Sequence, residues 1–200
     1  MGKCSLCGER KGNRVCLGLK SGICSLCCGT KREKEIPCLP ACEYLGKGTA
    51  YQLGREITKK ISSDLASESG DVFQMDEVAD FVLPIERFFV DEFYRDKGIN
   101  DNHIYQSLAK IYAFQTGVVP TLDAGNHTEK LIFEKFTDVN RRSDLLNSLK
   151  ARAILRLIKS INSSSGGVLG NRNYLEMIYS QHTGNGKWTD LFLEMESKGR

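Results

Sequence analysis

Apolar residues recur every three or four positions through most of the chain after residue 48, a spacing typical of amphipathic helices. The first such stripe consists of Leu53, Ile57, Ile61 and Leu65. It predicts a helix from about residue 50 to 68. Thr49 and Gln52 match a capping box at its start, and the polar segment from Ser67 to Asp71 ends it.

A second, more apolar stripe predicts the most buried helix of the chain. It consists of Val78, Phe81, Val82, Ile85, Phe88, Phe89 and Phe93. Pro84 lies inside this stripe and has no backbone N–H to donate, so we expect the helix to bend or split near Val82 and Leu83. The stripe ends before Gly98, a residue type that often follows helix termini.

Later stripes predict three helices capped by Asp101, by Asn126 with Glu129, and by Ser143. A shorter helix is expected around Tyr174, before Gly184. A last amphipathic turn or two is marked by Trp188, Leu191, Phe192 and Met195. No strand-like alternation follows residue 48, so we predict an all-α domain of six or seven helices over residues 49–200.

The N-terminal segment differs because it contains every cysteine of the chain. These are Cys4, Cys7, Cys16, Cys24, Cys27, Cys28, Cys38 and Cys42. Two Cys-x2-Cys pairs in so short a stretch are typical of structural zinc sites, where four ligands surround each ion. Eight thiolates fill two such sites, so residues 1–48 are predicted to form a small metal-stabilised zinc-finger module with two Zn²⁺ and β-hairpin knuckles.

The order of the pairs predicts how the two ions are shared. We assign Cys4, Cys7, Cys24 and Cys27 to the first zinc, and Cys16, Cys28, Cys38 and Cys42 to the second. This interleaving is a cross-brace, and the spacing over residues 4–42 resembles the cross-brace zinc fingers, most of all the B-box. The resemblance implies a protein-interaction module.

Two features depart from the B-box pattern. The closing ligands are Cys38 and Cys42 where the B-box has histidines, and Leu19 stands where an acidic ligand is expected. Cys28, directly after the second pair, is the candidate replacement. An iron–sulfur cluster or a redox Cys-x2-Cys are alternatives, but a cluster needs only four of these thiolates and no βαβ pattern is present.

Charge adds a second possible partner. The chain has a net charge of +3, and its first 48 residues hold nine Lys or Arg against four Asp or Glu. The basic residues around the knuckles are Lys3, Arg10, Lys11, Arg14, Lys20, Lys31, Arg32 and Lys34. They could bind RNA or DNA, although two tetrathiolate zinc sites carry a negative charge that nearly cancels the surplus.

The helical domain offers weaker signals for binding or catalysis. The glycine-rich segment from Ser163 to Arg172 precedes a helix, but it lacks a Walker lysine and is more simply a loop. Arg152, Arg156 and Lys159 share a helix face that is either solvated or binds phosphates. His103, His127 and His182 are scattered and form no catalytic motif.

These patterns favour a zinc-binding, non-catalytic interaction or adaptor protein that binds a protein partner. The alternative is a nucleic-acid-associated factor, and an enzyme with its active site in the helical domain stays open. No apolar run has the length of a membrane span or a signal peptide, and clustered cysteines without a secretion signal indicate a reducing compartment. We therefore expect a cytoplasmic protein without a membrane partner.

Overall fold

The computed structural model describes residues 2–68, 70–187 and 189. The chain divides into two compact units, Met1–Glu56 and Ile57–Arg200. The boundary between them falls inside helix α2, Glu43–Ser67. The domain boundary after residue 48 that we expect from the sequence concerns independent folding, and it stays a prediction.

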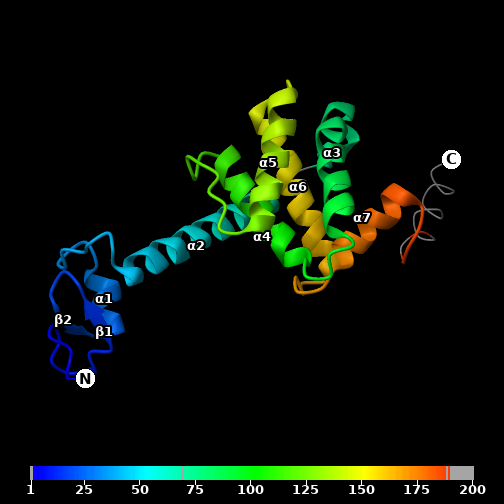
Figure 1. The fold of residues 1–200 in the computed structure, drawn as a ribbon. Coiled ribbons are helices and arrows are strands. Elements are labelled where there is room, and N and C mark those ends of the chain that lie inside the picture. The colour runs from blue at the N-terminus through cyan, green and yellow to red at the C-terminus, as the bar shows by residue number, and fades with distance from the viewer. Residues whose placement is uncertain (1, 69, 188, 190–200) are drawn as a thin grey trace. The chain divides into compact units, whose positions relative to one another are not determined.

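The first unit contains one small hairpin, one short helix and the first part of α2 (Figure 1). Strands β1, Arg14–Cys16, and β2, Ser21–Ile23, are antiparallel, with Val15 opposite Gly22. Helix α1, Ser25–Lys31, follows directly, so the hairpin and the start of the helix together carry Cys16, Cys24, Cys27 and Cys28. The strands of the described residues are confined to this unit, as the sequence predicts.

The apolar core of the first unit is small. Apart from cysteines, its fully buried apolar residues are Ile23 and Ile36. The rest of the buried cluster is Cys4, Cys16, Cys24, Cys27 and Cys28. A core of two isoleucines stabilises a unit of this size poorly, because folding removes too little apolar surface from contact with water.

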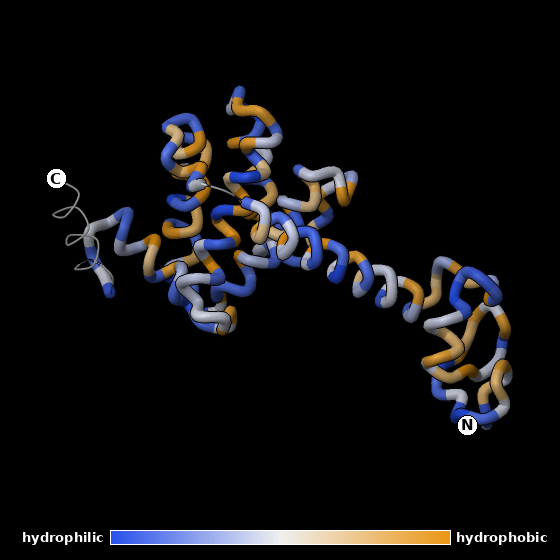
Figure 2. The backbone as a smooth tube through the Cα atoms, turned by 180° about the vertical axis from the view of Figure 1, so that it is seen from behind, coloured by the Kyte–Doolittle hydropathy of each residue, from blue (hydrophilic) through white to orange (hydrophobic). Residues whose placement is uncertain are grey.

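The second unit is helical throughout its described residues. After the end of α2 it contains η1, Val72–Gln74, and the five helices α3, Asp76–Phe93, α4, Asp101–Gln115, α5, His127–Arg142, α6, Asn147–Ser165, and α7, Asn173–Thr183. With α2, six α-helices lie in the described part of residues 49–200, which confirms the all-α prediction for this range. Figure 2 shows apolar and hydrophilic residues alternating along these helices.

Helix α6 lies at the centre of the second unit. It contacts α3, α4, α7 and η1, and its fully buried residues include Ala153, Ile154, Leu157, Ile158 and Ile161. The predicted stripe of α3 is also confirmed, since Val78, Phe81, Ile85 and Phe89 are buried. This core buries more apolar residues than the core of the first unit does.

Two predicted helix starts are wrong. Neither helix begins at the threonine or serine that is predicted to cap it. Helix α2 begins at Glu43 rather than near residue 50, since the carbonyl of Cys42 already accepts from the amides of Leu45 and Gly46. Thr49 lies inside the helix, and its hydroxyl donates to the carbonyls of Leu45 and Gly46. Helix α6 begins at Asn147, so Ser143 precedes the helix instead of capping it.

The caps of α4 and α5 are formed by residues next to the helix start. Asn126 caps α5 as predicted, accepting from the Glu129 amide at 2.9 Å. Asn100, not Asp101, caps α4, with His103 closing the capping box. Helix α3 runs unbroken through Pro84, because the carbonyl deprived of its donor belongs to exposed Asp80.

Two further sequence predictions concern the last turn of the chain and the membrane. The predicted turn at Trp188, Leu191, Phe192 and Met195 lies outside the described residues, which contain only Thr189 of that segment. None of the helices described is both long and apolar enough to cross a bilayer.

Candidate metal centre

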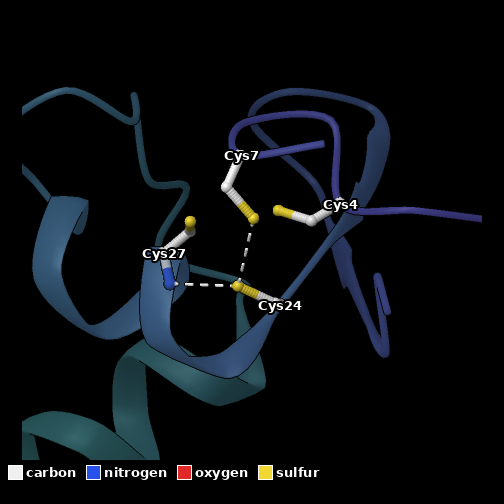
Figure 3. A group of neighbouring side chains, drawn as sticks. All are labelled: Cys4, Cys7, Cys24 and Cys27. Carbon is white, nitrogen blue, oxygen red and sulfur yellow. Dashed lines mark hydrogen bonds between the residues drawn. The ribbon is translucent and has the colours of Figure 1, made fainter. Parts of the chain in front are cut away.

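Four of the eight cysteines meet at one point of the first unit (Figure 3). Cys4 and Cys7 lie on the N-terminal turn, which closes through a 2.8 Å bond from the Gly8 amide to the Cys4 carbonyl. Gly8 has a φ of 67°, a left-handed conformation that a glycine adopts without strain. Cys24 caps α1 and Cys27 lies in its first turn, so the second pair comes from a helix start.

The sulfurs of this quartet are arranged as a tetrathiolate site requires. All four Sγ atoms lie within 4.8 Å of one another, and those of Cys7 and Cys24 are 4.0 Å apart. Sulfurs of a tetrahedral site are about 3.8 Å apart when each is about 2.3 Å from Zn²⁺. Cys4, Cys24 and Cys27 are buried, and Cys7 is partly exposed. The quartet therefore fits a closed structural site for a thiophilic metal ion.

Backbone amides around the quartet favour thiolates. Burial raises the pKa of Cys4, but backbone hydrogen bonds from Cys24, Cys7 and Leu6 outweigh it and lower the pKa. The amide of Cys27 donates to the Cys24 sulfur at 3.4 Å and lowers the pKa of that thiol. The pKa of Cys27 is raised because its thiol is hydrogen-bonded to Cys24 and buried. These hydrogen bonds therefore favour the thiolate form of Cys4 and Cys24, which is the form that binds a metal ion.

The other four cysteines line a second cavity in the same unit. Cys16 comes from β1, Cys28 from α1, and Cys38 and Cys42 from the segment before α2. Two isoleucines, Ile23 and Ile36, form an apolar wall of the same cavity. Among the cysteines, all of which the structure describes, only the first quartet has its sulfurs gathered within 4.8 Å. The membership of the second site therefore stays a prediction.

Two arginines face the second cavity. The guanidinium of Arg32 donates to the Cys28 sulfur at 3.8 Å, and Arg14 also hydrogen-bonds to that thiol. Burial raises the pKa of Cys28, but the two arginines outweigh it, so its net pKa is lowered. Arg14 in turn lies 4.8 Å above the ring of Tyr44. The two arginines therefore place positive charge beside the Cys28 sulfur.

This role of the arginines is not evident from the sequence, which groups them with the lysines as nucleic-acid contacts. Arg10 belongs to the same class, because its guanidinium hydrogen-bonds to the Cys24 sulfur and its pKa is raised. One local signal exists: Arg32 follows Cys28 by four residues at the end of a helix, so the two side chains share a face. The positions of Arg10 and Arg14 depend on the fold.

The glycine-rich segment of the second unit is a structural loop. Ser165 ends α6 and Gly166 caps it with a φ of 60°. The guanidinium of Arg172 donates to the backbone carbonyls of Phe93, Tyr94, Asp96 and Ile99. Since Arg172 holds the end of α3 and the turn after it, the side chain is committed to the fold and not to a phosphate.

Two of the three basic residues of the α6 stripe likewise form ion pairs within their own unit. Arg152 pairs with Glu68 at 2.6 Å, and Arg156 pairs with Asp71 at 3.0 Å while lying over the ring of Phe73. His103 belongs to a helix cap, and Nε2 of His182 lies 3.6 Å from a carboxylate oxygen of Glu86. These contacts join helices and outline no catalytic group.

No protein-family model matches the chain, and neither a curated protein nor a solved structure matches it. The likeness to the B-box therefore rests on cysteine spacing alone. The geometry of the cysteines carries the functional interpretation.

Proposed function

We propose that the chain is a zinc-dependent interaction protein in which zinc holds the N-terminal unit in one shape. The single observation that carries this proposal is the quartet of Cys4, Cys7, Cys24 and Cys27, whose sulfurs lie within 4.8 Å of one another. Four thiolates complete the coordination of Zn²⁺, so the ion has no open position for a substrate. Its role is then structural, and the unit acts by binding.

We further propose a second structural zinc held by Cys16, Cys28, Cys38 and Cys42. This is supported by their meeting in one cavity and by the arginines beside Cys28. Four thiolates and one Zn²⁺ together have a formal charge of −2. Nearby cations stabilise such a partly buried negative charge. The cross-brace pairing follows from this assignment, and the reduced thiols that it needs suit a cytoplasmic protein.

A protein partner is favoured by the surface of the first unit. Ten large apolar residues are exposed among those described, and six of these belong to the first unit: Val15, Leu17, Leu26, Leu39, Tyr51 and Leu53. The side chain of Val15 is 65% exposed in the hairpin that bears Cys16. Exposed apolar residues are typical of protein-binding surfaces where they form one contiguous patch.

The alternative, a nucleic-acid-binding function, loses part of its basis. Arg10, Arg14 and Arg32 hydrogen-bond to cysteine sulfurs, and Lys31 pairs with Glu35 at 2.6 Å. Half of the eight basic residues that the sequence offers are thus engaged within the unit. Binding that falls steeply with added salt would favour this alternative.

Zinc content tests the metal sites directly. Protein purified without added metal should contain two zinc ions per chain by elemental analysis, and Cys7→Ser and Cys38→Ser should each contain one. The variants remove one ligand from each predicted quartet, so a Cys38→Ser protein with unchanged zinc would reject the second site. A wild-type chain without zinc would reject both.

Cross-linking in cells tests the interaction surface. Val15→Asp should lose its protein cross-links, because a charge at the hairpin surface opposes an apolar contact. Val168→Asp is the matched control, since Val168 is also 65% exposed and lies in the second unit. Both variants should keep two zincs. Equal cross-linking of both variants, or loss of all cross-links on nuclease treatment, would contradict a protein partner at this surface.

A further inference from the structure

A groove runs between α3 and α5 in the second unit, and no cysteine lines it. Figure 1 shows the two helices, and they are in contact. One cavity of about 500 Å³ is lined mainly by α3 residues from Asp80 to Glu92. A second, of about 230 Å³, extends towards the end of α5. The two adjoin, because Asp80, Pro84 and Lys135 line both.

The groove is rich in acceptors that have no internal partner. Its carboxylates include Glu77, Asp80, Asp91 and Glu92, all exposed, and no ion pair found within the described residues uses any of them. Asp138 differs, since it pairs with Arg141 and Arg142. The groove therefore presents negative charge to a ligand.

Pro84 adds a backbone acceptor to the same place. A proline has no N–H, so the carbonyl of Asp80, four residues earlier, lacks its helical donor. Leu83 beside it is 37% exposed although it is a large apolar residue. A carbonyl without its i+4 donor, carboxylates and an exposed leucine together suit a ligand that has both donors and apolar groups.

The cations of the groove are fewer. Arg87 is exposed and Lys135 is half-buried, with its ammonium 5.9 Å from the centre of the Phe88 ring. Neither forms an ion pair within the described chain. Counting these two cations against the four free carboxylates leaves the groove negative. Lys135 lines both cavities, and its positive charge opposes the binding of a cationic group of the ligand beside it.

We propose that this groove binds a basic, amphipathic segment of a protein partner. Its Lys or Arg side chains contact Asp80, Asp91 and the Asp80 carbonyl, and an apolar side chain covers Leu83. Charge complementarity selects this occupant over an acidic segment or a nucleic acid. The inference deepens the proposed interaction function, and it rests on that function while using no residue of the zinc sites.

The test uses the full chain and a fluorescein-labelled amphipathic peptide of Lys, Leu and Ala, with a Glu, Leu and Ala peptide as its counterpart. Fluorescence polarisation should show binding of the Lys peptide alone. Asp80→Asn with Asp91→Asn should weaken it about fivefold, the effect of two partly exposed charge pairs. Lys135→Gln should tighten it, because the opposing charge is gone.

A matched control changes the same net charge elsewhere. Asp123→Asn with Glu134→Gln alters residues that line neither cavity, and binding should stay as in the wild type. Equal weakening by both double variants, binding of the Glu peptide, or binding of a single-stranded oligonucleotide through Lys135 would overturn the proposal. Chelator-treated chain should still bind the Lys peptide, so failure of the zinc sites and failure of the groove are separable.

Discussion

Several charged side chains of the second unit form hydrogen bonds within that unit. Asp101 is fully buried and accepts from the amides of Tyr174 and Leu175 at the start of α7. The hydroxyl of Tyr174 donates to the buried carboxylate of Glu86 at 3.0 Å. Polar groups this deep stay stable because each has a partner, since an unpaired one costs about 1–3 kcal/mol.

The pair of Asp71 and Arg156 gives a pH-dependent prediction. The Arg156 guanidinium holds the pKa of Asp71 below its ordinary value of 3.8. The pair therefore stabilises the fold above that value, and the stabilisation is lost as the pH falls through the lowered pKa. Asp71→Asn should cost about 0.5–1 kcal/mol at neutral pH and progressively less as the pH falls below 3.8, by urea unfolding followed by circular dichroism with chelator present.

The helix cap at this position should survive the substitution. The side-chain amide oxygen introduced by Asp71→Asn can still accept from the Phe73 backbone, as the carboxylate does at 3.1 Å. Asp123→Asn serves as the control, because this carboxylate bonds only to the Thr121 hydroxyl at 2.9 Å among the contacts described. An equal loss of stability at neutral pH and below pH 3.8 would show that the cap or local packing, not the ion pair, accounts for the effect.

Among the secondary-structure elements, the turn of the hairpin is fixed by a close backbone contact. Gly18 lies between β1 and β2, and a Cβ on it would overlap the carbonyl oxygen of Pro37. Gly18 follows Cys16 by two residues, and Pro37 directly precedes Cys38. The contact therefore brings two predicted ligands of the second zinc towards each other.

Gly18→Ala should accordingly weaken zinc retention. The methyl group forces the turn away from Pro37, a strain of about 1–3 kcal/mol. Competition with a chromophoric chelator should show one zinc released more easily than in the wild type. Gly46→Ala is the matched control, since nothing lies within 4 Å of the added methyl in helix α2 and alanine favours a helix. Unchanged retention in Gly18→Ala would argue that the turn does not position the site.

Across the molecule, the two units differ in what stabilises them. The first has two buried isoleucines beside its cysteines, and the second has a continuous apolar core from η1 to α7. Structural zinc contributes roughly 10–16 kcal/mol of apparent binding energy in small fingers. The first unit should depend on metal, and the second should not.

Hydrogen exchange with and without chelator tests this difference. Removing metal should expose the amides of residues 2–42 to rapid exchange and leave those of α4, α6 and α7 protected. Zinc added back should restore protection of residues 2–42. Loss of protection in both units together would show that the second unit needs the first, against the core that its helices form.

Features that depend on neighbouring residues could be predicted from the sequence alone. The eight cysteines, the 3.6-residue stripes of α3 and α6, and the Asn126 cap are local patterns, because adjacent turns of the chain settle them. The all-α class followed from these stripes, as the described helices confirm. The absence of strands after residue 48 within the described chain followed from the same periodicity.

Contacts between distant residues needed the folded chain. The fold gathers Cys4, Cys7, Cys24 and Cys27, brings Arg14 to Cys28, and uses Arg172 to hold the end of α3. Such contacts join residues far apart in the chain, and no periodicity in a sequence encodes the direction in which a side chain points.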